Sequence, residues 1–170
     1  MMDKDITARL ETLKVLVVDD EHFMRKVVRT LLISVGVRHV FEAPDGVSGL
    51  EAIRALAPDI VILDWGMPGL DGCGFVRIVR SPQTFPYPAI PIIMLTGHGV
   101  RSRVVEAVRL GVNEFLLKPV SSKALLDRIK SVLLHPRPIV QEGNYYGPAP
   151  RKIADMKIED PAYKELVLVN

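Results

Sequence analysis

Polar side chains directly follow several apolar runs of this sequence. Asp19 and Asp20 follow the run LKVLVV, and Asp64 ends the run DIVILD. Thr96 follows the run IIML, and Lys118 follows the run EFLL. Short apolar runs rich in Val and Ile are typical of buried parallel strands, so these polar residues are expected at strand ends.

Ligands of an open parallel sheet bind at the carboxyl ends of its strands, so these side chains are expected to converge on one small cleft. Converging carboxylates repel each other unless a cation lies between them, and oxygen ligands are typical of Mg²⁺. Lys118 would supply a fixed positive charge and Thr96 a hydroxyl, which together could hold a phosphoryl group beside the metal. Asp64 is then the candidate nucleophile, which would accept the phosphoryl group as an acyl phosphate.

Strand and helix patterns alternate from residue 13 to residue 135, and they predict the elements that position these groups. The expected strands are 13–18, 40–43, 59–64, 92–95 and 114–117. Apolar residues at helical spacing predict helices over about 21–35, 47–56, 75–79, 100–110 and 121–133. Five repeats of a strand and a helix imply an α/β fold, in which helices cover both faces of a parallel sheet.

The composition excludes several classes of protein. The 170 residues are 48% hydrophobic, and the formal net charge of +2 gives no electrostatic argument for binding nucleic acid. The single cysteine excludes an intramolecular disulfide and a multi-cysteine zinc site. No apolar stretch approaches the roughly 20 residues of a spanning helix, and the start lacks the pattern of a secretory signal. We therefore expect a cytoplasmic protein that does not associate with a membrane.

The patterns divide the chain into three parts. Residues 1–11 are a short N-terminal lead, and residues 12–135 form one domain. Residues 136–170 are rich in proline, carry balanced charge and show no pattern for a core of their own, which predicts an irregular C-terminal tail. The tail segment with Tyr145 and Tyr146 could fold back onto the domain or bind a partner, and the apolar residues 166–169 could pair with a sheet edge.

The sequence resembles the CheY-like receiver domains of two-component response regulators over about residues 12–135. Four motifs carry the resemblance, in the expected order on the expected elements. They are VVDDE at 17–21, DWGMPGLDG at 64–72, MLTG at 94–97 and LKP at 117–119. The resemblance implies a flavodoxin-like, doubly wound (βα)5 sandwich with parallel strands in the order 2-1-3-4-5.

The resemblance also implies the residues of the phosphorylation site. Asp64 would be the phosphoacceptor, and Lys118 would contact the phosphate. Asp19 and Asp20 would bind Mg²⁺, directly or through water, together with the carboxylate of Asp64. The backbone carbonyl of Gly66 would be a further metal ligand.

Other positions would control the switch and the lifetime of the phosphate. Thr96 would be the switch hydroxyl, and Phe115 occupies the place of the switch aromatic residue, although a buried core aromatic is an equally good interpretation. Gly66 and His98 occupy places that tune hydrolysis of the aspartyl phosphate. A cis peptide bond is expected before Pro119.

The resemblance implies a response regulator of a two-component phosphorelay, and we expect it to be stand-alone because residues 136–170 lack the length and helical pattern of an output domain. It would accept phosphate from a histidine kinase or a histidine phosphotransfer protein and signal through protein contacts of the fourth helix, fifth strand and fifth helix. Its only chemistry would be Mg²⁺-dependent self-phosphorylation and slow self-dephosphorylation, so it is not expected to be an enzyme acting on other substrates. Opposite charges on this face, including Arg109, Glu114 and Arg128, could pair across a phosphorylation-dependent homodimer.

Two other functions are compatible with this fold class. A phosphohydrolase with an aspartyl nucleophile usually has a D-x-D motif after its first strand, whereas Asp19 and Asp20 are adjacent here. A flavin-binding module needs a phosphate-binding loop rich in Ser, Thr and Gly after the first strand, where the acidic residues of this chain would repel phosphate. The phosphohydrolase is the stronger alternative.

Overall fold

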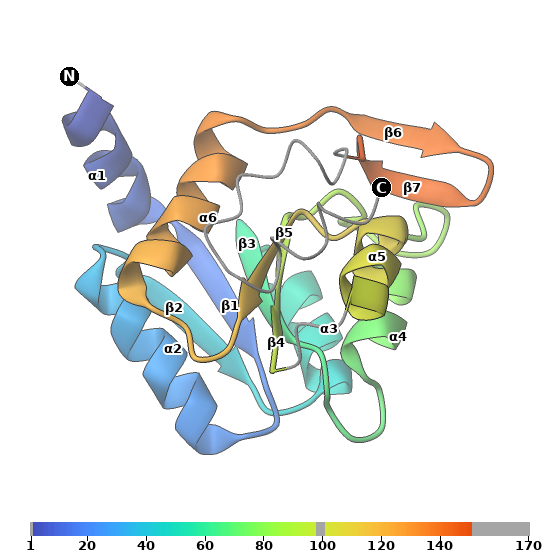
Figure 1. Cartoon of the computed structure of the whole chain (residues 1–170), viewed down its shortest axis with the longest axis horizontal. Helices are drawn as coiled ribbons and strands as arrows, with labels where there is room; N and C mark the ends of the chain where they lie inside the picture. Colours follow the sequence, from blue (N-terminus) through green and yellow to red (C-terminus); the bar gives the residue numbers. More distant parts are fainter. Residues whose placement is uncertain (1, 98–100, 151–170) are drawn as a thin grey trace.

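A five-stranded parallel sheet forms the centre of the computed structural model, which describes residues 2–97 and 101–150 (Figure 1). The strand order is β2-β1-β3-β4-β5, which confirms the expected flavodoxin-like topology. The observed strands differ from the expected ones by at most one residue at either end. They are β1 (Lys14–Val18), β2 (His39–Ala43), β3 (Ile60–Asp64), β4 (Ile92–Thr96) and β5 (Glu114–Leu117).

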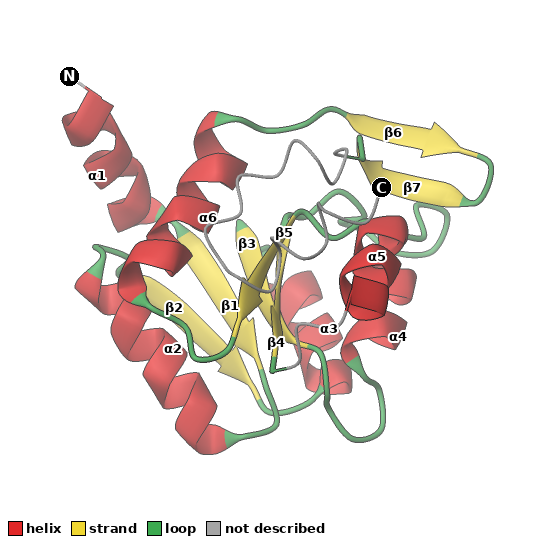
Figure 2. Ribbon diagram, in the orientation of Figure 1, coloured by secondary structure: helices red, strands yellow, loops and turns green. Residues whose placement is uncertain are grey.

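Helices cover both faces of the sheet (Figure 2). Those expected from the sequence are α2 (His22–Ser34), α3 (Gly46–Leu56), α4 (Gly72–Val79), α5 (Arg101–Leu110) and α6 (Ser122–Leu134). Buried side chains of α3, α4 and α5 share one core with the sheet, and those of α2 and α6 share the other. Among the described helices, none is long and apolar enough to span a membrane.

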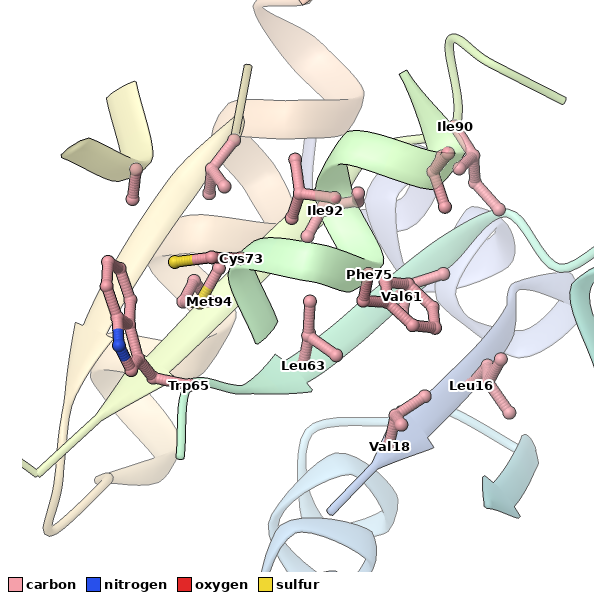
Figure 3. Close-up of a cluster of buried hydrophobic side chains, with 14 of the residues drawn as sticks. Leu16, Val18, Val61, Leu63, Trp65, Cys73, Phe75, Ile90, Ile92 and Met94 are labelled. Atoms are coloured by element: carbon pink, nitrogen blue, oxygen red, sulfur yellow. The ribbon is translucent and has the colours of Figure 1, made fainter. Parts of the chain in front are cut away.

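The alternation of side chains along the strands supplies both cores. Leu16 and Leu63 belong to the core under α3 and α4, whereas Val17 and Ile62 belong to the core under α2 and α6. Figure 3 shows the first of these cores, where the ring of Phe75 lies between the sheet and α4. A strand buried on both faces is apolar throughout, which explains the continuous apolar runs of the sequence.

The structure contains an N-terminal helix that the sequence analysis did not predict. Helix α1 (Met2–Thr12) buries Ile6 and Leu10 in the core under α2 and α6. Arg9 donates a hydrogen bond from Nη1 to the carbonyl oxygen of Leu133 in α6, over 3.1 Å. The segment expected as a short lead therefore packs on the domain as a helix.

The structure also contains a β-hairpin after α6, where an irregular tail was expected. Strands β6 (Ile139–Glu142) and β7 (Tyr145–Pro148) pair in antiparallel register and form a separate two-stranded sheet. The hairpin lies beside the end of α5 (Figure 1). Residues 166–169, for which strand pairing was considered, lie outside the described residues.

Candidate functional site

Three carboxylates meet at the carboxyl ends of β1 and β3. Asp19 and Asp20 directly follow β1, and Asp64 is the last residue of β3. Each of the three offers an oxygen atom that lies within 4.8 Å of the others. Asp19 is 1% exposed and Asp64 6% exposed, whereas Asp20 is open to solvent. The structure therefore brings together the acidic residues that the sequence indicated.

Lys118 extends into this acidic group from the end of β5. Its Nζ donates a hydrogen bond of 2.7 Å to Oδ1 of Asp64 and lies 3.8 Å from Oδ2 of Asp19. Burial lowers the pKa of Lys118, but the hydrogen bond and the negative charges outweigh burial, so the pKa lies above its usual value. Lys118 is therefore a fixed positive charge in contact with Asp64, and the bond from Lys118 to Pro119 is cis, as expected.

Asp19 is held in an electrostatically unfavourable place. Burial raises its pKa to about 6, and the charges of Asp64 and Asp20 add to the effect. The backbone N–H of Glu21 donates to Oδ1 over 2.9 Å and, with Lys118, opposes the shift. Oδ2 is the buried side-chain oxygen without a hydrogen-bond partner among the described residues.

The donor set fits a hard divalent cation. Carboxylate oxygens are the preferred ligands of Mg²⁺ and Ca²⁺, and a cation would relieve the repulsion among the three aspartates. Oδ2 of Asp19, which accepts no hydrogen bond among the described residues, would gain a ligand contact in the same step. Gly66 lies in the exposed loop after β3, where a side chain would meet nothing within 4 Å. This acidic cluster is compatible with a metal site.

The residues predicted to control the switch and the phosphate lifetime are Thr96, Phe115 and His98. Thr96 ends β4 and is 1% exposed, beside the start of the connection to α5. Phe115 pairs with Met94 in the sheet register and is buried in the core under α3 and α4, which is the arrangement of a core aromatic residue. His98 lies outside the described residues.

Two further residues support the site and were missed by the sequence analysis. Arg25 on α2 donates from Nη1 to the backbone carbonyl of Asp19 over 2.8 Å and so fixes the end of β1. Gly72 starts α4 so close to β3 that an added Cβ would lie 2.8 Å from the carbonyl oxygen of Asp64. Arg25 lies five residues after Asp20, and nothing in the sequence around it signals this contact. Gly72, in contrast, is the last residue of the motif DWGMPGLDG.

Comparisons with known proteins identify relatives of the chain. The family model of the response regulator receiver domain matches residues 15–130. The chemotaxis protein CheY of Pseudomonas aeruginosa is 32% identical over 120 residues, which cover 71% of this chain and 95% of that protein. Chemotaxis protein CheY1 of Helicobacter pylori is 38% identical over 122 residues, covering 71% and 97%.

Similar folds are found among solved structures. The structure of Vibrio cholerae CheY4 has a TM-score of 0.64 and 32% sequence identity, and covers 71% of this chain and 98% of its own. The aligned residues, the strand order and the acidic cluster beside Lys118 all agree with one family. The chain belongs to the response regulator receiver domain family.

Proposed function

We propose that this response regulator accepts a phosphoryl group on Asp64 from a phosphohistidine of a histidine kinase or a histidine phosphotransfer protein. The contact between Lys118 Nζ and Asp64 Oδ1 at 2.7 Å carries the proposal, because a cation beside this carboxylate could also bind an oxygen of a phosphoryl group attached to it. Asp19 and Asp20 complete the site as the proposed ligands of Mg²⁺, with Asp64 and the Gly66 carbonyl.

Phosphoryl transfer needs positioning and charge neutralisation more than covalent help from the protein. Bound Mg²⁺ would neutralise the carboxylates and the phosphoryl oxygens. A carboxylate oxygen of Asp64 forms the new bond to phosphorus as the bond from phosphorus to the donor nitrogen breaks, and the imidazole then takes a proton. Lys118 exchanges its bond to Asp64 for one to a phosphoryl oxygen, and the Thr96 hydroxyl contacts a second. Hydrolysis of the acyl phosphate by water completes the slow self-dephosphorylation.

Substitution of the phosphoacceptor tests this function. Asp64→Asn should abolish phosphoryl labelling by acetyl phosphate and Mg²⁺, read by intact mass. Asp71→Asn is a matched control, because Asp71 caps α4 through the N–H of Gly74 and asparagine caps equally well. The control should label like the unsubstituted protein. Label that persists on Asp64→Asn contradicts the assignment.

The same proposal includes a surface that binds a downstream protein. Contacts with a downstream protein are placed on the face formed by α5, β5 and α6. A phosphorylation-dependent homodimer stays a prediction, but Glu114 is 3% exposed and accepts a hydrogen bond from Ser131 within the chain, so its charge is not available to a second copy. Sedimentation with and without beryllofluoride tests the dimer, and an unchanged mass contradicts it.

The receiver family does not favour the phosphohydrolase, and hydrolysis of a generic phosphate ester would be the observation in its support. A cytoplasmic location stays a prediction. The two curated relatives are named as chemotaxis proteins, and a partner in chemotaxis is one candidate for the downstream protein.

A further inference from the structure

The β6–β7 hairpin rests on the end of α5 through a contact between two glycines. An added Cβ on Gly147 would lie 3.1 Å from the Cα of Gly111, and one on Gly111 would lie 3.0 Å from the carbonyl oxygen of Tyr146. Gly111, which follows α5, has φ of 96°, a conformation that favours glycine. A larger side chain at Gly111 would therefore press on the hairpin backbone, and one at Gly147 would press on Gly111 and on the Tyr145 hydroxyl, which lies 3.0 Å from the added Cβ.

Arg137 joins the base of the hairpin to the start of β5. Its Nη2 donates to the carbonyl oxygen of Asn113 over 2.6 Å, and its Nη1 donates to that of Ala149 over 2.7 Å. Ala149 in turn donates to the carbonyl oxygen of Pro138 over 2.8 Å, which closes the base of the hairpin. The hairpin is thus held at two points, one after α5 and one before β5.

One point adjoins β5, which ends at the proposed phosphorylation site, and the other follows α5, the helix that comes after Thr96 in the chain. Helix α5 follows Thr96 in the chain and packs chiefly against α4 and β7. Its 10 residues span about 15 Å, and the contact with the hairpin lies just after its last residue, at Gly111. Strand β5 similarly begins beside Asn113 and ends at Lys118. A displacement of β5 at Lys118 would therefore act on Asn113, whose carbonyl oxygen accepts the hydrogen bond from Arg137.

The outer strand of the hairpin, β6, is loosely packed, whereas β7 is half-buried at its start and buried at its end. Three of the four residues of β6 are exposed. A cavity of about 170 Å³ lies beneath the base of the hairpin, lined by residues that include Glu114, Ser131, His135 and Ile139. The buried contacts that oppose separation of the hairpin are therefore confined to β7 and Arg137, and a segment held at so few points is suited to local opening.

We propose that the β6–β7 hairpin is an intramolecular regulatory element, docked on Gly111 and Asn113 in the unphosphorylated protein and released when Asp64 is phosphorylated. The inference rests on the proposed phosphorylation of Asp64. Because coupling between two sites is reciprocal, release of the hairpin also strengthens binding of the phosphoryl group or its analogue. The surface uncovered at the end of α5 adjoins the face proposed for the downstream protein.

Hydrogen exchange of the intact chain tests the release. With beryllofluoride and Mg²⁺, the amides of residues 139–149 should exchange at least about fivefold faster, the lower end of typical allosteric coupling, while those of β1 and β3 stay protected. Asp64→Asn should show no such change. Fluorine NMR reports whether beryllofluoride is bound. Unchanged hairpin exchange in a protein that binds beryllofluoride overturns the regulatory role alone, and absence of binding to the unsubstituted chain overturns the phosphorylation proposal with it.

Paired glycine variants test the reciprocal effect. Gly147→Ala places a methyl group against Gly111 and should tighten beryllofluoride binding about fivefold. Gly143→Asn is the matched control, because an added Cβ there meets nothing within 4 Å and asparagine tolerates its φ of 57°. The control should bind like the unsubstituted chain. Equal affinity of Gly147→Ala and the unsubstituted chain overturns the coupling.

Discussion

Asp19 is buried in an electrostatically unfavourable environment, which indicates a binding site for a cation. A carboxylate that is 1% exposed, lies close to two others and has one oxygen without a hydrogen bond among the described residues costs free energy when no cation is bound. Functional sites are common places for such perturbed groups, because binding a ligand relieves the unfavourable charge. The destabilisation at Asp19 is therefore expected to disappear when a divalent cation binds.

The raised pKa of Asp19 predicts how stability depends on pH without a divalent cation. The folded protein holds this proton up to about pH 6, whereas an ordinary aspartate has a pKa of 3.8. Between these two values the folded state binds more protons than the unfolded chain, so the contribution of Asp19 to the free energy of unfolding falls as pH rises. Urea unfolding at several pH values, with chelator present, measures the free energy of unfolding of the unsubstituted protein and of Asp19→Asn. The pH dependence of the difference between the two proteins is the contribution of Asp19.

The same pair of proteins tests cation binding. Millimolar Mg²⁺ should raise the midpoint of thermal unfolding of the unsubstituted protein at pH 7 and raise that of Asp19→Asn less, because the variant lacks one anionic ligand. Fluorescence of Trp65, the only tryptophan and the neighbour of Asp64, gives a second measurement. Identical pH dependence and identical response to Mg²⁺ in the two proteins would contradict both expectations.

The fit between α4 and the end of β3 controls the position of Asp64. Gly72→Ala would force a Cβ to within 2.8 Å of the Asp64 carbonyl oxygen and 3.0 Å of the Trp65 Cα. Backbone atoms cannot move aside as a flexible side chain can, so we expect a loss of about 2 kcal/mol in the free energy of unfolding.

Gly66→Ala is the control for Gly72→Ala. The new Cβ at residue 66 meets nothing within 4 Å, and the backbone carbonyl stays available, so stability should change by less than about 0.5 kcal/mol. Denaturant unfolding of both variants measures the difference. An equal loss of stability in the two variants would show that the close approach of α4 to β3 has no special cost.

Arg80 is a buried cation at the end of α4 that holds three segments together. It is 6% exposed and donates to the carbonyl oxygens of Gly111, Pro88 and Ile90, and to the side-chain oxygen of Asn113. Burial lowers its pKa to about 10, which still leaves it charged at neutral pH. It therefore connects α4 to the loop before β4 and to the turn between α5 and β5.

Replacing Arg80 should destabilise the fold strongly. Arg80→Met leaves buried carbonyl oxygens without donors, and we expect the free energy of unfolding to fall by about 3 kcal/mol. Arg77→Met is the matched control on the same helix, because its side chain is 63% exposed and lies 3.8 Å from Glu106. Exposed pairs of this kind contribute at most about 1 kcal/mol. Calorimetry measures the loss of stability in both variants. A larger loss in Arg77→Met than in Arg80→Met would refute this role of Arg80.

These elements show what the sequence could and could not predict. The strands were predicted because burial on both faces makes them apolar throughout and polar residues follow their ends. The strand order was implied by the family resemblance. Arg80 was not recognised, because its partners are backbone carbonyls of distant segments and nothing local separates it from the exposed Arg77. The β6–β7 hairpin had one signal, the pair Gly143 and Asn144 at its turn, which is typical of a two-residue hairpin loop.

At the scale of the whole molecule, the two ends of the described chain extend the receiver core. The hairpin adds a small sheet beside α5, and α1 adds apolar side chains to the core under α2 and α6. Helix α1 escaped prediction because Ile6 and Leu10 are a single pair at helical spacing among charged residues, which is too short a pattern to separate from a solvated segment.

The packing of α1 predicts that it unfolds together with the domain. Leu10 is 4% exposed and lies close to Gly36, where a Cβ would be 3.9 Å from it, so Leu10→Ala should lower the free energy of unfolding by about 3 kcal/mol. Ile33→Ala on α2 is the control, because Ile33 is 56% exposed and its loss should cost less than about 0.5 kcal/mol. Urea unfolding followed by circular dichroism and by Trp65 fluorescence should give one coincident transition for each protein, shifted only by Leu10→Ala. An unshifted midpoint, or a separate early loss of helix, would instead support an N-terminal lead that is independent of the domain.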